Sequence, residues 1–363
     1  MKVILIGAGR YGNGLVGSKY AKGDYFGTKI DSVVDPEIKN ISGQENYNLL
    51  GAKEYDSFDK IPDENIDENT VVEMAVVPEI IPEIFNRITN RGIKKVILPK
   101  PVTHDFASFI KMKKISDEKG IKSVVASNWH YSDITKLTRE VLFKVIGGKI
   151  EGNTAKKYNF DIDSIKDKFE VENVEIEYSK KHEVLTIDPP AQEMPHALQI
   201  LYSVGITDFG DEKYYLDPNK QSESAVHVEF KKVPGIKHGI TINSDLQKGD
   251  KTDLRRERLL KIYLNDDDPE ADIIADYDAQ FEKGVCTKPA SITVDITKDN
   301  KTTKLKTEIT EDNMDAMYKS MFDYLRGEEN NALEIDDYEP IALKISQIQT
   351  DWEKALKLKN AKN

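Results

Sequence analysis

Cysteine is nearly absent from this chain, since Cys286 is the only one among 363 residues. A single cysteine cannot form an intramolecular disulfide, and Cys286 lacks the partner spacing of a zinc site. Long apolar runs are also missing, because no stretch approaches the roughly 18 residues that a membrane-spanning helix needs. These two shortages favour a reducing compartment and exclude a chain that crosses a bilayer. We interpret Cys286 as an ordinary residue without a reactive role.

Positive charge is in deficit as well, because 52 lysines and arginines stand against 64 acidic residues and leave a formal net charge of −12. Such a field repels phosphate backbones, so a nucleic-acid partner would require a concentrated basic face. The one dense basic cluster is interrupted by an acid and precedes an alternating apolar set, which is typical of a strand that begins at a solvated end of a sheet. That cluster consists of Arg255, Arg256 and Arg258 around Glu257, ahead of Leu260, Ile262 and Leu264. We predict no nucleic-acid partner.

Two further short segments bear on compartment and metal content. The first residues lack the charged region and the small-residue cleavage site of a secretory signal, and an apolar strand begins at once. We therefore expect the protein to reside in the cytoplasm. A carboxylate cluster can hold a metal, but we interpret the acidic run Asp266–Asp268 as an exposed loop. No metal site is predicted.

The chain is too long for one ordinary core, because single cores stop growing at roughly 250 to 300 residues. Its first third alternates strand and helix signals, which is typical of βαβ units. Strands are predicted near 2–6, 29–35, 71–78, 94–99 and 121–126, with a helix over 11–21 after the first of them. This pattern predicts a doubly wound parallel sheet of the Rossmann type over residues 1–126.

From about residue 150 the pattern changes to alternating strands, which favours an open, mostly antiparallel sheet. These strands are predicted at 174–178, 225–230, 237–246, 258–264 and 291–296. Helices are predicted at 132–146, joining the domains, and at 195–204, 313–326 and 340–358. We therefore expect an α/β domain over residues 127–363 for substrate binding and oligomerisation, with its last helix packing back toward the first domain.

Glycines spaced G-x-G-x-x-G follow the first strand in "KVILIGAGRYGNGL". In a strand–turn–helix setting Gly7 allows the tight turn, Gly9 lets a pyrophosphate approach the backbone, and Gly12 lets the helix pack close to the strand. Asp35 ends the second strand near the spacing expected for an acid that binds the ribose hydroxyls. Its carboxylate would repel a 2′-phosphate, so NAD is favoured over NADP. A glycine turn that binds no dinucleotide, or one that binds a flavin, remains an alternative.

Ligands in such sheets lie beyond the carboxyl ends of the strands. The segments at that edge are Val77-Pro78, Leu98-Pro99-Lys100-Pro101 and Ser127-Asn128-Trp129-His130-Tyr131. A lysine between two prolines has a rigidly directed backbone, so Lys100 is expected to project into the cofactor crevice. The alternative for Lys100 is an exposed lysine on a loop.

Five segments together resemble the Gfo/Idh/MocA family of glucose-fructose oxidoreductase and inositol dehydrogenase, over nearly the whole chain. They are "ILIGAGRYG", "VVDP", "GIKKVILPKP", "ASNWHYS" and "EMPHALQILYSVG". The resemblance implies a Rossmann domain joined to an α/β domain with an open sheet. It implies that Lys100 contacts substrate and the nicotinamide region, and that His196 is the active-site histidine. The expected cofactor-binding residues are Gly7, Gly9, Arg10, Tyr11, Gly12, Asp35, Val77, Pro78 and Lys100.

The chain departs from the family pattern at three positions. Pro99 stands where the family usually has glutamate, Pro82 lies near a common histidine, and Gln192 replaces an aspartate. Glutamine cannot accept a proton, so we consider the adjacent Glu193 as a third catalytic candidate. The expected substrate-side residues are Asn128, Trp129, His130, Tyr131 and Gln192. Packing alone is the alternative for the aromatic pair Trp129 and Tyr131.

These residues predict reversible hydride transfer between NAD and a carbon that bears a hydroxyl on a small polar metabolite, most simply a sugar or polyol. In the oxidative direction His196 would accept the hydroxyl proton, and Lys100 would stabilise the developing charge on the same oxygen. An imine or double-bond reductase of the same fold is one alternative. A protein that binds NAD and a metabolite as a sensor without turnover is another. The family resemblance also implies a homodimer or homotetramer formed through the second sheet.

Overall fold

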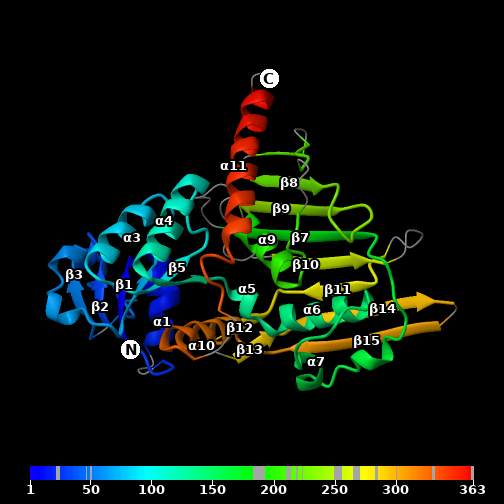
Figure 1. Cartoon of the computed structure of the whole chain (residues 1–363), viewed down its shortest axis with the longest axis horizontal. Coiled ribbons are helices and arrows are strands. Elements are labelled where there is room, and N and C mark those ends of the chain that lie inside the picture. The colour runs from blue at the N-terminus through cyan, green and yellow to red at the C-terminus, as the bar shows by residue number, and fades with distance from the viewer. Residues whose placement is uncertain are drawn as a thin grey trace. The chain divides into compact units, whose positions relative to one another are not determined.

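The computed structural model describes most of the chain, which divides into two compact units (Figure 1). The described residues are 1–21, 25–45, 47–49, 51–182, 193–209, 214–217, 220–222, 224–248, 256–264, 270–282, 285–299, 301–328 and 332–360. The first unit comprises Met1–Ser127 and Met317–Ser346, and the second comprises Asn128–Ala316 and Gln347–Asn363. The predicted domain limits, 1–126 and 127–363, stay a prediction.

A six-stranded parallel sheet forms the first unit, in the order β3-β2-β1-β4-β5-β6. The strands are β1 (Lys2–Ile6), β2 (Lys29–Val34), β3 (Lys53–Tyr55), β4 (Thr70–Met74), β5 (Lys95–Pro99) and β6 (Lys122–Ala126). Every residue of β4 is buried, as expected of a central strand covered on both faces. The strand order reverses between β1 and β4, which is the switch point where such sheets bind ligands. The predicted doubly wound sheet is confirmed.

Helices and short turns connect these strands. They are η1 (Arg10–Gly17), α1 (Ser18–Tyr20), α2 (Ile38–Ile41), η2 (Phe58–Lys60), η3 (Asp63–Asn65), α3 (Ile81–Asn90) and α4 (Phe106–Lys119). The ends of α4 follow from sequence, because the Asp105 carboxylate accepts a hydrogen bond from Ser108 N at 2.7 Å and Gly120 closes the helix in a left-handed conformation. Helix α3 begins with Pro82 in its first turn, where its missing N–H costs nothing.

A C-terminal segment returns to the first sheet and covers its β6 edge. Val125 N donates to Leu333 O at 2.8 Å, and Ile335 N donates to Ser123 O at 3.1 Å. Most of α10 (Asn313–Arg326) and the start of α11 (Glu339–Asn360) belong to the same unit. This return had no signal in the strand and helix pattern, because pairing with β6 involves residues about 200 positions away in the chain.

The second unit is built on a seven-stranded sheet in the order β15-β14-β11-β10-β7-β9-β8. The strands are β7 (Asn173–His182), β8 (Ala225–Phe230), β9 (Ile240–Lys248), β10 (Arg256–Tyr263), β11 (Ile273–Asp276), β14 (Ala290–Lys298) and β15 (Lys301–Ile309). Among the described strands of this sheet, only β7 and β9 pair in parallel. The predicted open, mostly antiparallel sheet is confirmed, although β11 and β15 were not anticipated. A separate hairpin joins β12 (Gln280–Glu282) and β13 (Val285–Lys288).

Helices α5, α6 and α9 lie in front of this sheet in Figure 1 and cover its inner face. The helices of the unit are α5 (Asn128–Tyr131), α6 (Asp133–Val145), α7 (Thr154–Lys157) and α9 (Met194–Ser203), with a short turn η4 (Ile162–Ser164). Alternate strand residues point inward and are buried, as Val174, Ile176 and Tyr178 are on β7. This inner face is the core of the second unit.

The opposite face of the sheet is polar and half-buried. Asn243 Nδ2 donates to Glu175 at 3.3 Å and to Glu177 at 3.1 Å. Lys261 pairs with Glu175 at 3.4 Å, and the Tyr263 hydroxyl donates to the same carboxylate at 3.0 Å. The face therefore satisfies its own charges, and the predicted assembly through this sheet stays a prediction. Among the described residues, no helix combines the length and apolarity that crossing a bilayer requires.

Candidate functional site

The turn from Gly7 to Gly12, here called the glycine turn, links β1 to η1 at the switch point of the first sheet. Gly7 has φ +99°, and a methyl group there would lie 2.4 Å from Ala75 O. A methyl group on Gly12 would lie 1.9 Å from Gly7 O. A methyl group on Gly9, by contrast, would meet no atom within 4 Å. The protein's own packing therefore requires Gly7 and Gly12, whereas the space beside Gly9 is open to a ligand.

The segment after Gly9 is helical, as predicted, but it winds as a π-helix over Arg10–Gly17 before α1. Such wide turns are frequent at functional sites. Arg10 and Tyr11, two predicted cofactor contacts, are exposed at its start. The free N–H groups of this first turn are the donors that a pyrophosphate would use.

Asp35, the predicted ribose acid, is tied to the glycine turn. Its Oδ2 accepts a hydrogen bond from Ala8 N at 2.8 Å, and its Oδ1 accepts one from Glu37 N at 2.9 Å. Each carboxylate oxygen has a second lone pair, so both oxygens keep capacity for further donors. The carboxylate is therefore held in place by main-chain amides and can still receive hydroxyl groups.

The remaining predicted residues of the first unit follow β4 and β5. Val77 is 53% exposed, whereas Pro78 beside it is buried. Lys100 is half-buried directly after β5, and its peptide bond to Pro101 is cis. Pro99, at the family's glutamate position, is the buried last residue of β5. Since all strands are parallel, these segments share the sheet edge at which the glycine turn lies.

A carboxyl group that the sequence interpretation did not single out lies on β4. Glu73 is 1% exposed and accepts hydrogen bonds from the Tyr318 hydroxyl at 2.5 Å and the Tyr20 hydroxyl at 3.2 Å. Burial raises the pKa of Glu73 to about 7, although the two tyrosine hydrogen bonds act in the opposite direction. Glu73 thus links β4 to α1 and to α10 inside the first unit.

The second unit brings three aromatic rings and a guanidinium together on the inner face of its sheet. The His196 ring stacks on the Tyr178 ring with centroids 5.2 Å apart and planes inclined by 14°. Trp129 meets His196 edge-on at 6.3 Å, and its Nε1 donates to the Tyr178 hydroxyl at 3.2 Å. The Arg258 guanidinium lies 5.2 Å from the Tyr178 ring and 5.6 Å from the Trp129 ring. We call these four residues the aromatic platform.

The elements that carry the platform are widely separated in the chain. Trp129 lies on α5, Tyr178 on β7, His196 on α9 and Arg258 on β10. Tyr178 and Arg258 are directly opposite one another in the antiparallel pair of β7 and β10, so their side chains emerge side by side. Tyr277, whose pKa burial raises to about 12, closes the base by an edge-on contact with Trp129 at 5.3 Å.

Arg258 corrects the sequence interpretation, which placed its cluster at a solvated sheet end. Its side chain is half-buried over two aromatic rings. The reason is strand parity, because residues two apart share a face and Arg258 stands in step with the buried Leu260 and Ile262. That parity was readable in the sequence and could have identified Arg258. Arg255 and the Arg256 side chain lie outside the described part of the structure.

The other predicted substrate-side residues are divided between packing and polar contacts. Trp129 and Tyr131 are both 3% exposed, so the expected aromatic wall is part of the core, and Tyr131 meets His130 edge-on. His130 Nδ1 lies 3.1 Å from Ser203 Oγ, which fixes its ring against the end of α9. Asn128 is half-buried at the start of α5.

Glu193, the candidate for the missing family acid, and Gln192, which stands at the position of that acid, have different outcomes. Glu193 is 2% exposed at the start of α9, and its backbone oxygen accepts a hydrogen bond from His196 N at 2.9 Å. Gln192 lies outside the described residues, as do Asp266–Asp268. In the part of the chain that the structure describes, no group of three or more potential metal ligands occurs.

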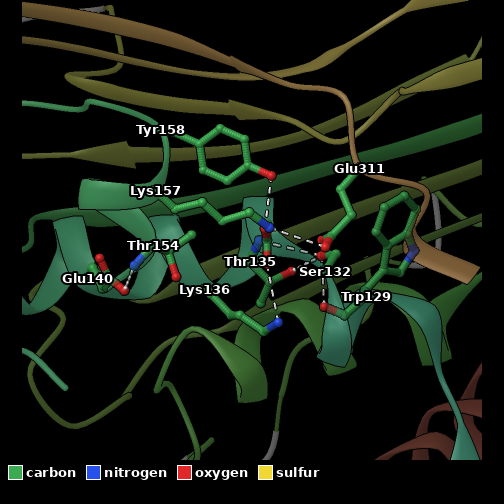
Figure 2. A network of polar contacts seen from close by, with 10 residues as sticks. Trp129, Ser132, Thr135, Lys136, Glu140, Thr154, Lys157, Tyr158 and Glu311 are labelled. Atoms are coloured by element: carbon green, nitrogen blue, oxygen red, sulfur yellow. Dashed lines mark hydrogen bonds and ion pairs between the residues drawn. The ribbon is translucent and has the colours of Figure 1, made fainter. Parts of the chain in front are cut away.

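A buried polar network holds the segment that carries Trp129 (Figure 2). The Ser132 hydroxyl donates to Trp129 O at 3.0 Å and caps α6 by accepting from Thr135 N. Next in the chain, the Asp133 carboxylate receives Lys157 and the Tyr158 hydroxyl, the latter at 2.8 Å. Lys157 extends to Glu311 at 3.4 Å.

The charges of this network respond to one another. Burial acts to raise the pKa of Asp133, but the hydrogen bond from Lys157 and the Lys136 charge keep that pKa below its usual range. Burial raises the pKa of Glu311, and the neighbouring Asp133 charge adds to the effect. The network therefore joins α6, α7 and the chain after β15 through one ionised carboxylate, and Ser132 connects it to α5, which carries Trp129.

No family model matches the sequence, and no curated protein matches it either. Solved structures do resemble the fold over almost the whole chain. A UDP-N-acetylglucosamine 3-dehydrogenase from Acidithiobacillus ferrooxidans is 12% identical, with a TM-score of 0.63 over 96% of this chain and 97% of that one. An oxidoreductase from Agrobacterium radiobacter in complex with NAD+, L-tartaric acid and magnesium is 13% identical, with a TM-score of 0.63 over 95% and 94%. A probable dehydrogenase from Thermotoga maritima is 14% identical, with a TM-score of 0.64 over 99% and 97%. At these identities the likeness establishes the fold.

Proposed function

We propose that the protein is an NAD-dependent oxidoreductase of the Gfo/Idh/MocA type, which transfers a hydride between nicotinamide and a hydroxyl-bearing carbon of a small polar metabolite. The observation that carries this proposal is the glycine turn. Gly9 alone of its three motif glycines faces open space, at the switch point and beside an anchored Asp35. The likeness to dehydrogenase structures, one of them holding NAD+, supports the proposal.

The residues present fit a dinucleotide. A pyrophosphate beside Gly9 would accept hydrogen bonds from the first amides of η1, and the ribose hydroxyls would donate to Asp35. A 2′-phosphate would face that carboxylate, so NAD is preferred to NADP. When bound, the nicotinamide supplies the hydride acceptor, and the protein supplies geometry and charge.

Two side chains would act on the substrate hydroxyl. His196 would take its proton in the oxidative direction, with its ring held in place by stacking on Tyr178. Lys100 would donate a hydrogen bond to the same oxygen and stabilise the negative charge that develops there. The buried Glu193, one turn before His196, is the candidate to replace the aspartate that the family has at the position of Gln192. Asn128 and His130 would line the substrate side, together with Gln192.

The substrate class proposed is a sugar or polyol, in line with the nucleotide sugar that one structural neighbour is named for. Cytoplasmic residence and a homodimeric or homotetrameric assembly are parts of the same proposal. Two alternatives gain weight from Gln192, which cannot accept a proton, and the second of them also from Pro99, which has no ionisable side chain. One is an imine or double-bond reductase, and the other is an NAD-binding metabolite sensor.

Two matched glycine variants test the coenzyme site. A methyl group meets no atom within 4 Å at either Gly9 or Gly14, so Gly9→Ala and Gly14→Ala should both fold as the wild type does. Gly9→Ala should weaken NAD binding by roughly tenfold or more, about 1.4 kcal/mol, because its methyl group occupies the pyrophosphate position. Gly14→Ala should leave NAD affinity unchanged. If calorimetry on the folded wild type detects binding of neither NAD nor NADP, the proposal is overturned.

A third variant separates enzyme from sensor. Lys100→Met should keep NAD affinity and reduce turnover by roughly 10²-fold or more, as expected when one donor to a developing oxyanion is lost. Turnover is followed by the absorbance of the reduced coenzyme with hydroxyl and imine substrate panels. Bound NAD that stays redox-inert with every substrate, while metabolite binding shifts the oligomeric state, would favour the sensor.

A further inference from the structure

Among the residues that the structure describes, Arg258 has no counter-charge beside its guanidinium. In the described part of the chain, no carboxylate forms an ion pair with its guanidinium, and its buried Nε has no hydrogen-bond partner. Glu257, its neighbour in the chain, is exposed and belongs to the opposite face of β10. The described contacts of the guanidinium are the faces of Trp129 and Tyr178.

Arg258 is half-buried, and its buried Nε–H without an acceptor costs free energy. Contact with aromatic faces offsets part of that cost but supplies no acceptor for the Nε–H. The rings orient the fork but contain no charge that neutralises it. An anion from outside the chain would supply both the missing charge and the missing acceptor.

The position of Arg258 relative to His196 narrows the type of anion. The guanidinium and the imidazole are each centred 5.2 Å from the same Tyr178 ring. Measured across the Tyr178 ring, the two groups therefore lie within the length of a sugar acid or a sugar phosphate. Its anionic group would contact Arg258, and its hydroxyl would contact His196.

We propose that Arg258 is a substrate-binding residue that selects an anionic hydroxy compound, holding its carboxylate or phosphate group while His196 faces the hydroxyl. The planar guanidinium fork accommodates either group through two parallel hydrogen bonds. This inference rests on the proposed function and narrows its substrate class from sugars and polyols in general to their acids or phosphate esters.

The experiment compares anionic and neutral probes on the NAD-saturated, full-length chain. The probes are D-glucuronate, D-glycerate and D-glucose 6-phosphate, against neutral D-glucose and glycerol, and their dissociation constants are measured by calorimetry. The wild type should bind at least one anionic probe roughly 100-fold more tightly than its neutral counterpart, the discrimination expected of a bidentate pair. The D-glucuronate and D-glucose 6-phosphate arms distinguish carboxylate from phosphate.

Two variants and one control test whether Arg258 causes the preference for anionic probes. Arg258→Met should abolish the preference and leave the affinity for D-glucose unchanged, whereas Arg258→Lys should retain part of it because a lysine offers a point charge instead of a fork. Arg139→Met is the matched control, since Arg139 also lies over a ring, that of Phe143 at 5.4 Å, but is exposed on α6. The control should behave as the wild type.

Three outcomes overturn the inference. They are a wild type without preference for any anionic probe, an Arg258→Met variant that keeps the preference, and equal losses for anionic and neutral probes. If Arg258→Met does not fold, Arg258→Lys decides, with an expected loss of roughly tenfold confined to the anionic probes. A measurement of NAD binding distinguishes failure of this inference from failure of the proposed function. NAD that binds without any anion preference overturns only the inference about Arg258.

Discussion

The proposed coenzyme site in the first unit is made from consecutive main-chain atoms, whereas the aromatic platform in the second unit is made from side chains on four distant elements. In the glycine turn the decisive property is the absence of side chains at Gly7 and Gly12. In the platform it is the presence of Tyr178 and Arg258 at one register position of two paired strands. Local sterics therefore determine the first site, and sheet register determines the second.

This difference predicts how each site fails. A side chain at Gly7 or Gly12 overlaps with neighbouring backbone, so the overlap cannot be relieved by side-chain rotation. A change in the platform removes one contact of several, and its neighbours can adjust. Single substitutions should thus be far more damaging in the turn than in the platform.

The largest effect is expected for Gly12→Ala. Its methyl group would lie 1.9 Å from Gly7 O, so the turn must open, and we expect a loss of about 4 kcal/mol or more in the free energy of unfolding. NAD binding should be lost with it. Urea denaturation and calorimetry measure the two effects, with Gly14→Ala as control. If Gly12→Ala is as stable as the wild type, the first helix does not approach β1 as closely as the structure places it.

The next largest effect is a pH dependence of stability caused by Glu73, which accepts a hydrogen bond from Tyr20 on the helix after the turn. The pKa of Glu73 is about 7 in the folded protein, against 4.5 for the ordinary group. Between these pH values the folded state binds more protons than the unfolded state, so stability should fall as pH rises from 4.5 to 7 and then level off. The fall should amount to about 3 kcal/mol by linkage.

Urea denaturation at a series of pH values checks this dependence. Glu73→Gln should remove it and be more stable than the wild type at pH 8. Tyr318→Phe should extend the fall to higher pH, because the Tyr318 hydroxyl stabilises the ionised carboxylate. An unchanged pH profile in Glu73→Gln would contradict the assignment.

A smaller effect is expected where the polar network supports the platform. Asp133→Ala removes a buried carboxylate that receives Lys157 and Tyr158, and should cost about 2 kcal/mol of stability. Lys157 is 53% exposed and can be hydrated, which limits the loss. Lys304→Ala breaks the exposed pair with Asp295 and should cost at most about 0.5 kcal/mol in the same denaturation assay. Equal losses in the two variants would mean that the network contributes no more than a surface ion pair.

A smaller effect than that of Asp133→Ala is expected for Tyr178→Phe, which keeps the ring on which His196 stacks and removes the hydroxyl that accepts from Trp129 Nε1. We expect a loss of about 1 kcal/mol in stability and no loss of NAD affinity. Thermal denaturation and NAD calorimetry test both statements. A loss as large as that of Gly12→Ala would remove the proposed contrast between the two sites.

The sequence determined the parts of this protein that depend on neighbours in the chain. The alternation of apolar runs and helical stretches indicated the parallel sheet, and period-two patterns indicated most strands of the second sheet. The spacing of Gly7, Gly9 and Gly12 predicted the turn, because backbone conformation and close approach at a glycine are local steric properties. The distance from these glycines to Asp35 led to its prediction as the acid that binds the ribose.

Only the tertiary structure decided which distant residues meet. The return of Met317–Ser346 to the first sheet, the burial of Glu73 between two tyrosines and the aromatic platform all depend on pairings that alternation does not specify. Arg258 shows the physical reason. Its parity places it on the inner face of β10, but the β7–β10 register sets it beside Tyr178, the ring on which His196 stacks.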